Sequence, residues 1–195
     1  MFAFLLAAAV AATPPAADPC AYDRDRLLAL DQNAFDQDLK GGWRVLAQNP
    51  KCYVAAADLI RDYREAHHSS DSILFWHEGQ MRAFAGQNDA AIALFEKSRH
   101  KEPDPTGWNL YVNGSVAFLR HDRSALRSAR DKLAALPKPP DWPPTGPDGK
   151  PVNFPWPLNL NVLDGFLACF NQRYEKAYGT ATCTQPMMKV QVPRS

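Results

Sequence analysis

The sequence predicts a single all-α domain. Between residues 20 and 136, apolar residues recur at three- and four-residue spacing, which is the period of an amphipathic helix. No run in that region alternates apolar and polar residues as a half-buried strand does. The 195 residues, 46% of them hydrophobic, suit one core better than two small domains. The net charge of +1 gives no reason to expect nucleic acid or an anionic membrane as a partner.

The N-terminus contains an uncharged apolar run over residues 2–12. It is shorter than the roughly 20 residues that span a bilayer. It matches the apolar region of a secretory signal, with small residues directly before Thr13. We expect a signal peptide over residues 1–12, or as far as 17, no membrane span, and a mature domain over 18–195. The alternative is a buried N-terminal helix, since no Lys or Arg precedes the run.

The cysteines are even in number, as expected for a disulfide-bonded exported protein. They are Cys20, Cys52, Cys169 and Cys183. Four cysteines can form two disulfides in three different ways. We favour the way in which both bonds are local, Cys20–Cys52 and Cys169–Cys183. No CxxC motif suggests redox chemistry or zinc binding. The bacterial periplasm or the cell exterior is the expected location.

The N-terminal part predicts three helices. A short first helix lies near Leu27 and Leu30. The second covers residues 34–50 and is weakened at Gly41 and Gly42; its expected apolar side is Phe35, Leu39, Trp43 and Leu46. Pro50 suits the first turn of the third helix.

A 34-residue pattern follows. Its first copy places small, aromatic and turn residues at Gly79, Ala83, Gly86, Ala91, Ile92, Phe95, Ser98 and Pro103. Moving by 34 residues gives Ala117, Phe118, Ala125 and Pro137 as the counterparts of Ala83, Phe84, Ala91 and Pro103. The pattern resembles the tetratricopeptide repeat. The second copy departs from it, with Asn113, Arg120 and Ala129 opposite Gly79, Gly86 and Phe95.

This resemblance implies a right-handed stack of helical hairpins. Small residues such as Ala83 and Ala91 would let paired helices approach closely. Each pair would leave an apolar side that a neighbour or a cap must cover.

The C-terminal part supplies two candidates for that cover. Residues 137–157 hold nine of the 17 prolines, so the segment over 136–160 cannot continue a helix. Its aromatics, Trp142, Phe154 and Trp156, predict an ordered wrap pinned to the helices, and a mobile linker is the alternative. A capping helix over 161–178 follows, opened by a capping box from Asn161 to Asp164.

The resemblance also implies a concave groove. Its lining would be Trp76, Gln80, Phe84, Leu110, Gly114 and Phe118, with His77 and Tyr111 at the edge. An aromatic groove suits an apolar peptide or helix of a partner. The alternative is that the Pro-rich segment or the final helix of the chain fills the groove.

A second candidate surface is a basic stripe. The arginines Arg120, Arg123, Arg127 and Arg130 are three, four and three residues apart, so they would share one helix face. The stripe could hold an acidic partner or anionic lipid head groups, and the alternative is a solvated face.

No catalytic pattern is recognisable. The pair His77-Glu78 would need His at position 81 for a zinc protease helix, and Met81 stands there. There is no GxSxG elbow, Walker loop or dinucleotide fingerprint. We therefore expect no catalytic residues, metal or cofactor.

The expected function is protein–protein interaction by an exported, non-enzymatic helical-repeat protein of the bacterial envelope. One alternative is a neutralising partner of a secreted toxin or enzyme. Another is an enzyme whose site is assembled from residues distant in sequence.

Overall fold

The computed structural model describes residues 18–145, 149–152, 154–179 and 181–183. The expected signal peptide lies outside these ranges. The described residues are helical apart from loops, turns and one isolated bridge between Thr145 and Pro151. The all-α prediction is therefore confirmed for the described part of the chain. None of its helices combines the length and the apolar character that crossing a membrane requires.

The N-terminal elements are short until α3. They are α1 (Arg24–Leu28), the π-helical turn η1 (Asn33–Gln37), α2 (Arg44–Ala47), the 3₁₀ turn η2 (Pro50–Cys52) and α3 (Tyr53–Ala66). Pro50 occupies the first turn of η2, and the side chain of Asn49 caps it.

The predicted single helix over residues 34–50 is wrong. The chain turns sharply at Gly42, whose φ is +53°. A Cβ there would lie 1.8 Å from the carbonyl oxygen of Phe35, so only glycine fits. As a result Leu39, expected on the apolar side, is 77% exposed. Phe35, Trp43 and Leu46 are buried as expected.

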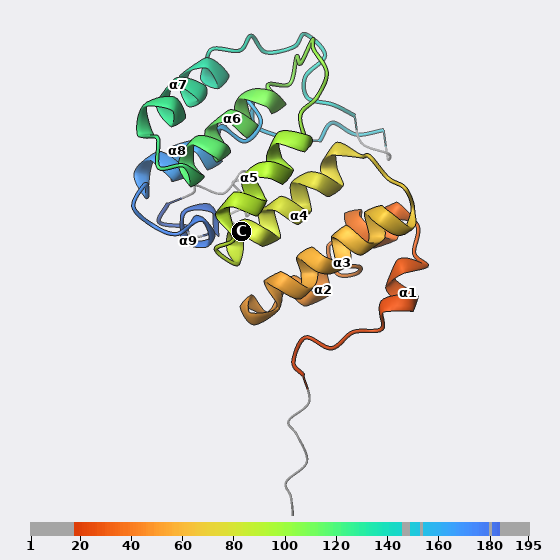
Figure 1. The fold of residues 1–195 in the computed structure, drawn as a ribbon. Helices are drawn as coiled ribbons and strands as arrows, with labels where there is room; N and C mark the ends of the chain where they lie inside the picture. Colours follow the sequence, from red (N-terminus) through yellow and green to blue (C-terminus); the bar gives the residue numbers. More distant parts are fainter. Residues whose placement is uncertain (1–17, 146–148, 153, 180, 184–195) are drawn as a thin grey trace, which may run out of the picture.

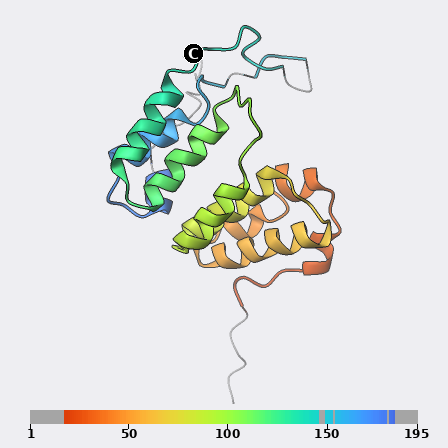
Figure 2. The same cartoon turned by 45° about the horizontal axis from the view of Figure 1, so that its top comes forward.

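Two helical hairpins form the middle of the chain (Figures 1 and 2). The first pairs α4 (Ser72–Phe84) with α5 (Asn88–Lys97), and the second pairs α6 (Trp108–Leu119) with α7 (Arg123–Ala134). Gly86, with φ +78°, makes the turn of the first. The assignment of these hairpins to the tetratricopeptide repeat remains a prediction.

The described part of the Pro-rich segment packs largely on itself. The Trp142 indole donates to the carbonyl of Phe154 over 3.0 Å, and the Trp142 and Trp156 rings meet at 4.9 Å. Trp156 also donates to the carbonyl of Leu136 over 3.1 Å, which ties the segment to the end of α7. One aromatic therefore pins this segment to the helices, while Phe154 is 36% exposed.

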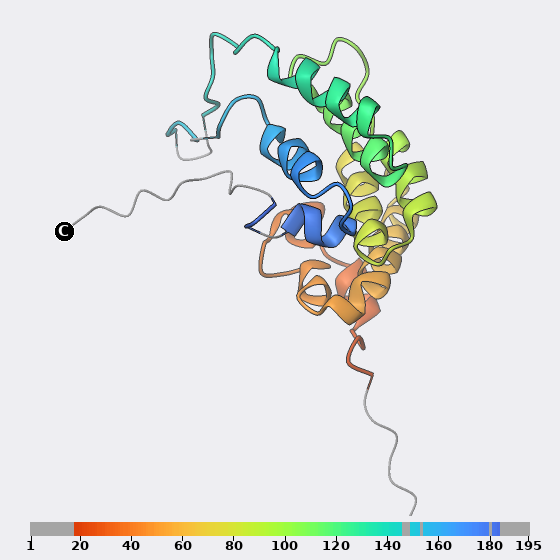
Figure 3. The same cartoon turned by 90° about the vertical axis from the view of Figure 1, so that its left-hand side faces the viewer.

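The last two helices are α8 (Leu160–Ala168) and α9 (Tyr174–Gly179). They lie together on one side of the layer formed by α4 to α7 (Figure 3). The predicted single helix over 161–178 is wrong, because the chain leaves helical geometry at Cys169. The expected capping box is wrong too: the N-cap residue is Asn159, with a φ of +62°.

Both favoured disulfides are present. Cys20 is bonded to Cys52 with a Cα–Cα distance of 5.3 Å, and Cys169 to Cys183 with 5.6 Å. The first joins the N-terminus to the start of α3, and the second closes the loop that contains α9. Such bonds are typical of proteins that fold in oxidising compartments.

Two hydrophobic clusters share α4. Leu74 and Met81 belong to the cluster built with α1 to α3. Trp76 and Ala83, on another side of α4, belong to the cluster built with α5 to α9. Helix α4 therefore couples the two halves of the fold.

Candidate functional site

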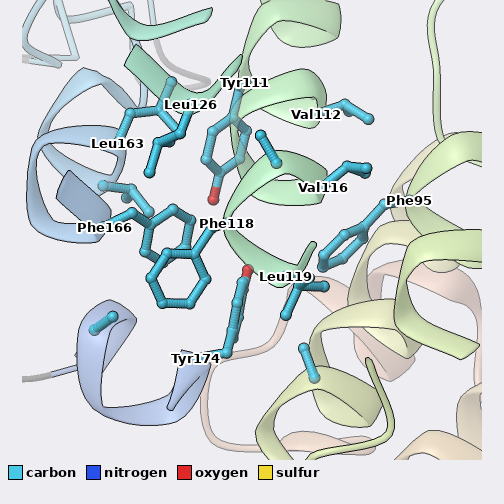
Figure 4. Packing of buried hydrophobic residues seen from close by; sticks show 14 of the residues in the cluster. Phe95, Tyr111, Val112, Val116, Phe118, Leu119, Leu126, Leu163, Phe166 and Tyr174 are labelled. Atoms are coloured by element: carbon cyan, nitrogen blue, oxygen red, sulfur yellow. The ribbon is translucent and has the colours of Figure 1, made fainter. Parts of the chain in front are cut away.

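The predicted groove is covered by the chain's own C-terminal helices. A Cβ on Gly114 would lie 2.5 Å from a methyl carbon of Leu163 in α8. The Phe118 ring stacks on Phe166 at 4.4 Å, and Tyr174 of α9 lies below them (Figure 4). The alternative in which a final helix fills the groove is thus the one observed, and α8 and α9 do so rather than the Pro-rich segment.

The predicted groove residues do not form one set. Five of them face α8 or α9: Gln80, Phe84, Tyr111, Gly114 and Phe118. The other three lie elsewhere. Trp76 stacks on Phe95 within the hairpin layer, and Leu110 lines a hollow between α5, α6 and α7.

The third, His77, binds a residue that sequence analysis did not single out. Its Nδ1 lies 2.6 Å from Oδ1 of Asp36, which is fully buried. The Trp43 indole donates to the same oxygen over 2.8 Å, and Gln37 donates to Oδ2. Burial opposes ionisation of Asp36, but the bonds from His77 and Trp43 outweigh it and lower its pKa. His77 therefore fastens α4 to η1.

Glu78 has a similar structural role. It is 4% exposed and accepts from Nε of Arg64 in α3 over 3.1 Å. Arg64 also lies over the Phe75 ring, 4.0 Å from its centroid. The pair His77-Glu78 thus makes two polar ties between α4 and the N-terminal elements.

A polar patch remains where α9 meets the helices beneath it. Arg44, Gln80, Tyr111 and Ser115, from α2, α4 and α6, form this patch, and we call it the inner face. Tyr174 of α9 lies close to Gln80 and Ser115, Tyr178 lies close to Tyr111, and their two rings stack at 5.8 Å. The charge of Arg44 also interacts with Tyr178. The inner face and α9 therefore form a polar contact that is buried at Gln80, Tyr111, Ser115 and Tyr174 and half-buried at Arg44 and Tyr178.

The two deepest tyrosines of this contact stay neutral. Burial raises the pKa of Tyr111 well above its ordinary value of 10.0, and the neighbouring Tyr178 and Tyr174 raise it further. Burial also raises the pKa of Tyr174 well above 10.0. Both phenols are consequently available as hydrogen-bond donors at neutral pH.

Three buried polar atoms at this contact are unpaired within the described part of the chain. They are Nε of Arg44, Nε2 of Gln80 and the hydroxyl oxygen of Tyr174. Gln80 is 7% and Tyr174 3% exposed, so bulk water does not satisfy these two side chains, whereas Arg44 as a residue is half-buried. An unsatisfied buried donor costs about 1–3 kcal/mol. The packing of α9 on the inner face therefore leaves buried polar atoms without hydrogen-bond partners.

A hollow of about 510 Å³ opens beside this contact. Its lining includes Phe118 and Tyr174, with Asn88, His121 and Arg173 nearer the ends of the helices. It lies between the α4–α5 turn, the α6–α7 turn and the loop before α9. A ligand could approach the edge of α9 from here.

The basic stripe does not form one surface. Arg120 ends α6 rather than lying on α7, and it lines the hollow that also contains Glu96. Arg130 is paired with Asp164 of α8 at 2.7 Å, and Arg123 contacts the carbonyl of Leu167. The stripe prediction is wrong in this respect, since two of the arginines hold α7 to α8. The remaining one, Arg127, is exposed.

Few local sequence patterns indicate the inner face. Tyr174 and Tyr178 are four residues apart, a spacing that puts both on one helix face without indicating what that face contacts. Arg44 and Ser115 come together with α9 only through the folding of distant segments, and no local pattern marks them.

No group of three or more His, Cys, Asp or Glu side chains within the described ranges is arranged to hold a metal ion. Comparisons of the chain with protein-family models, with characterised proteins and with solved structures find no match in any of the three.

Proposed function

We propose that this chain is an exported, non-catalytic binding protein of the bacterial envelope that recognises a helical segment of a partner protein on the inner face. Helix α9 occupies this face in the absence of the partner. The two hairpins would then act as tetratricopeptide-like repeats, a family arrangement in which short helices or peptides bind across the first helices of successive pairs.

The observation that carries the proposal is the incomplete contact beneath α9. On the inner face, Arg44 and Gln80 each leave a buried polar atom unpaired. A partner that supplied acceptors would gain the hydrogen bonds that α9 does not make. A segment with such acceptors could therefore replace α9.

The attachment of α9 also supports replacement. The helix has only six residues, of which Tyr174 and Ala177 are buried. Isolated helices of this length are unstable in water. The disulfide from Cys169 to Cys183 keeps α9 near the inner face and raises its effective concentration there.

Affinity capture from the native envelope tests this function. The full-length protein is compared with a Cys169→Ser/Cys183→Ser variant, in which α9 is no longer tethered. We expect the variant to capture more of a specific partner, and a synthetic peptide with the sequence of residues 173–179 to release it. The matched control is Cys20→Ser/Cys52→Ser, which removes the other disulfide while α9 stays tethered through Cys169 and Cys183, and should not increase capture. Equal capture by both variants, or no release by the peptide, would count against the proposal.

A further inference from the structure

The hollow beside α9 has an apolar floor. Its volume of about 510 Å³ is within the range of small-molecule sites, roughly 300–1,000 Å³. The Phe118 and Tyr174 rings of the floor lie 6.0 Å apart, edge to face (Figure 4). The buried side chains that line the hollow are Ala83, Phe118, Leu119 and Tyr174. The floor therefore suits the apolar part of a small ligand.

The rim of the hollow carries hydrogen-bond donors. Amide, imidazole and guanidinium groups contribute to it, and all of these can donate. They belong to Asn88 at the start of α5, His121 in the α6–α7 turn, and Asn171, Gln172 and Arg173 in the loop before α9. Among the described residues that line the hollow there is no Asp or Glu. The rim therefore offers donors and positive charge without a carboxylate.

Arg173 provides the fixed charge of this rim. It is exposed, and its side chain makes no hydrogen bond or ion pair within the described part of the chain. Arg82, near the end of α4, is by contrast paired with Asp58 at 2.6 Å. Glu175, two residues after Arg173, interacts with Tyr53 and does not line the hollow. The guanidinium of Arg173 is therefore available to an anion.

The α4–α5 turn keeps the mouth of the hollow free of a side chain. Gly86 stands there with a φ of +78°, a conformation that residues with a side chain rarely adopt. A Cβ on Gly86 would lie 3.4 Å from Nη2 of Arg173, so the guanidinium reaches this turn from the loop before α9. The disulfide from Cys169 to Cys183 anchors the start of that loop. The charged group and the open turn are thus adjacent.

We propose that this hollow binds a small organic acid that carries an apolar group. The carboxylate would accept from the guanidinium of Arg173, a charge-assisted bond that planar guanidinium and carboxylate groups favour. The apolar group would pack on Phe118 and Tyr174. No residue of the inner face lines the hollow, so this site is distinct from the inner face and does not depend on the proposed function.

An NMR titration of the oxidised full-length protein tests the site. The probe is phenylpropionate, which has one carboxylate and one ring, and the comparison compounds are its neutral amide and acetate. We expect saturable shifts of the backbone amide signals of Gly86, His121 and Arg173 with phenylpropionate. The neutral amide should bind about tenfold more weakly, since a hydrogen bond to a charged group is worth a factor of this order. Acetate buries no ring and should also bind at least about tenfold more weakly. No saturable shift, or equal binding of phenylpropionate and either comparison compound, would overturn the proposal.

A charge-removing variant tests the role of Arg173. Arg173→Gln should fold normally, because the side chain is exposed and has no partner in the described part of the chain. It should bind phenylpropionate about tenfold more weakly and no better than the neutral amide. The matched control is Arg127→Gln, which removes an exposed arginine of α7 that does not line the hollow and should leave binding unchanged. Equal effects of the two substitutions would overturn the proposal.

Hydrogen exchange gives a second readout. The Ala177 amide donates to the carbonyl of Arg173 over 3.0 Å and reports whether α9 is docked. Because Tyr174 of α9 forms part of the hollow, a ligand bound there stabilises the docked helix. With phenylpropionate at ten times its dissociation constant, exchange of Ala177 should be about tenfold slower. Unchanged exchange would show that the acid does not bind against α9 and would also overturn the proposal.

Discussion

The two halves of the molecule are stabilised by different interactions. The N-terminal half consists of short elements tied by buried polar groups, Asp36 with His77 and Arg64 with Glu78, and by the Cys20–Cys52 disulfide. The C-terminal half is an aromatic cluster in which α8 and α9 pack on the hairpins. The two kinds of core meet at α4, and the unpaired donors lie near that meeting place.

The difference has a physical reason. Short irregular elements such as η1 leave backbone and side-chain polar groups inside, which must then be paired. Regular helices satisfy their own backbone, so rings such as Phe118 and Phe166 can fill the space between them. The inner face draws its polar lining from both halves, with Arg44 from α2 and Tyr111 and Ser115 from α6. Its cover, α9, is aromatic, and the two match incompletely.

The largest expected effect is in the aromatic half. Phe166 is fully buried and lies 5.1 Å from the Tyr174 ring as well as stacking on Phe118. Phe166→Ala should lower the free energy of unfolding by about 4 kcal/mol, from lost burial and the cavity left behind. Urea unfolding followed by circular dichroism measures it. Phe154→Ala, in the Pro-rich segment, is the control and should cost less than about 1 kcal/mol. Similar losses in both variants would show that the cluster does not hold α8 in place.

A smaller and pH-dependent effect is expected in the polar half. Asp36→Asn keeps the shape of the side chain and removes its charge, so we expect a loss of about 2 kcal/mol at pH 7. The pKa of Asp36 is lowered below its ordinary value of 3.8. The contribution of the Asp36 carboxylate to the free energy of unfolding is therefore complete when the pH is above that value. It is lost as the pH falls through the folded-state pKa.

Unfolding free energies measured between pH 7 and pH 2 therefore should fall less steeply in acid for Asp36→Asn than for the wild-type chain. The acid dependence of the unfolding free energy that remains in Asp36→Asn, called the acid slope, comes from groups such as Asp62 and Glu96, whose pKa values are also lowered. The exposed neighbour Asp38 provides the control, since Asp38→Asn should leave the slope unchanged. An acid slope that survives Asp36→Asn in full would contradict the role given to the Asp36–His77 pair.

Some of the fold was predictable because its signals are local. The helical spacing gave the hairpins, Gly86 gave one turn, and sequence separation favoured the correct disulfides. The helix predicted over 161–178 shows the limit of such signals. Phe170 and Tyr174 keep helical spacing across a loop, because both contact the same cluster from two separate elements.

The candidate site was predictable only in part. Five of the predicted groove residues face α8 or α9: Gln80, Phe84, Tyr111, Gly114 and Phe118. Their role in binding a partner stays a prediction. That α9 covers them could not be read from the sequence, since it depends on the reversal of the chain after Cys169. The pairing of His77 with Asp36 is a contact over 41 residues, and neither residue has a local pattern that indicates the other.

In the proposed function, α9 detaches from the inner face while both hydrophobic clusters stay folded. Native-state hydrogen exchange of the Ala177 amide, measured with increasing urea in the oxidised full-length protein, tests this most directly. The account predicts exchange through a local opening with little dependence on urea, while core amides such as that of Leu119 follow global unfolding. Exchange of Ala177 with the same urea dependence and free energy as Leu119 would contradict it.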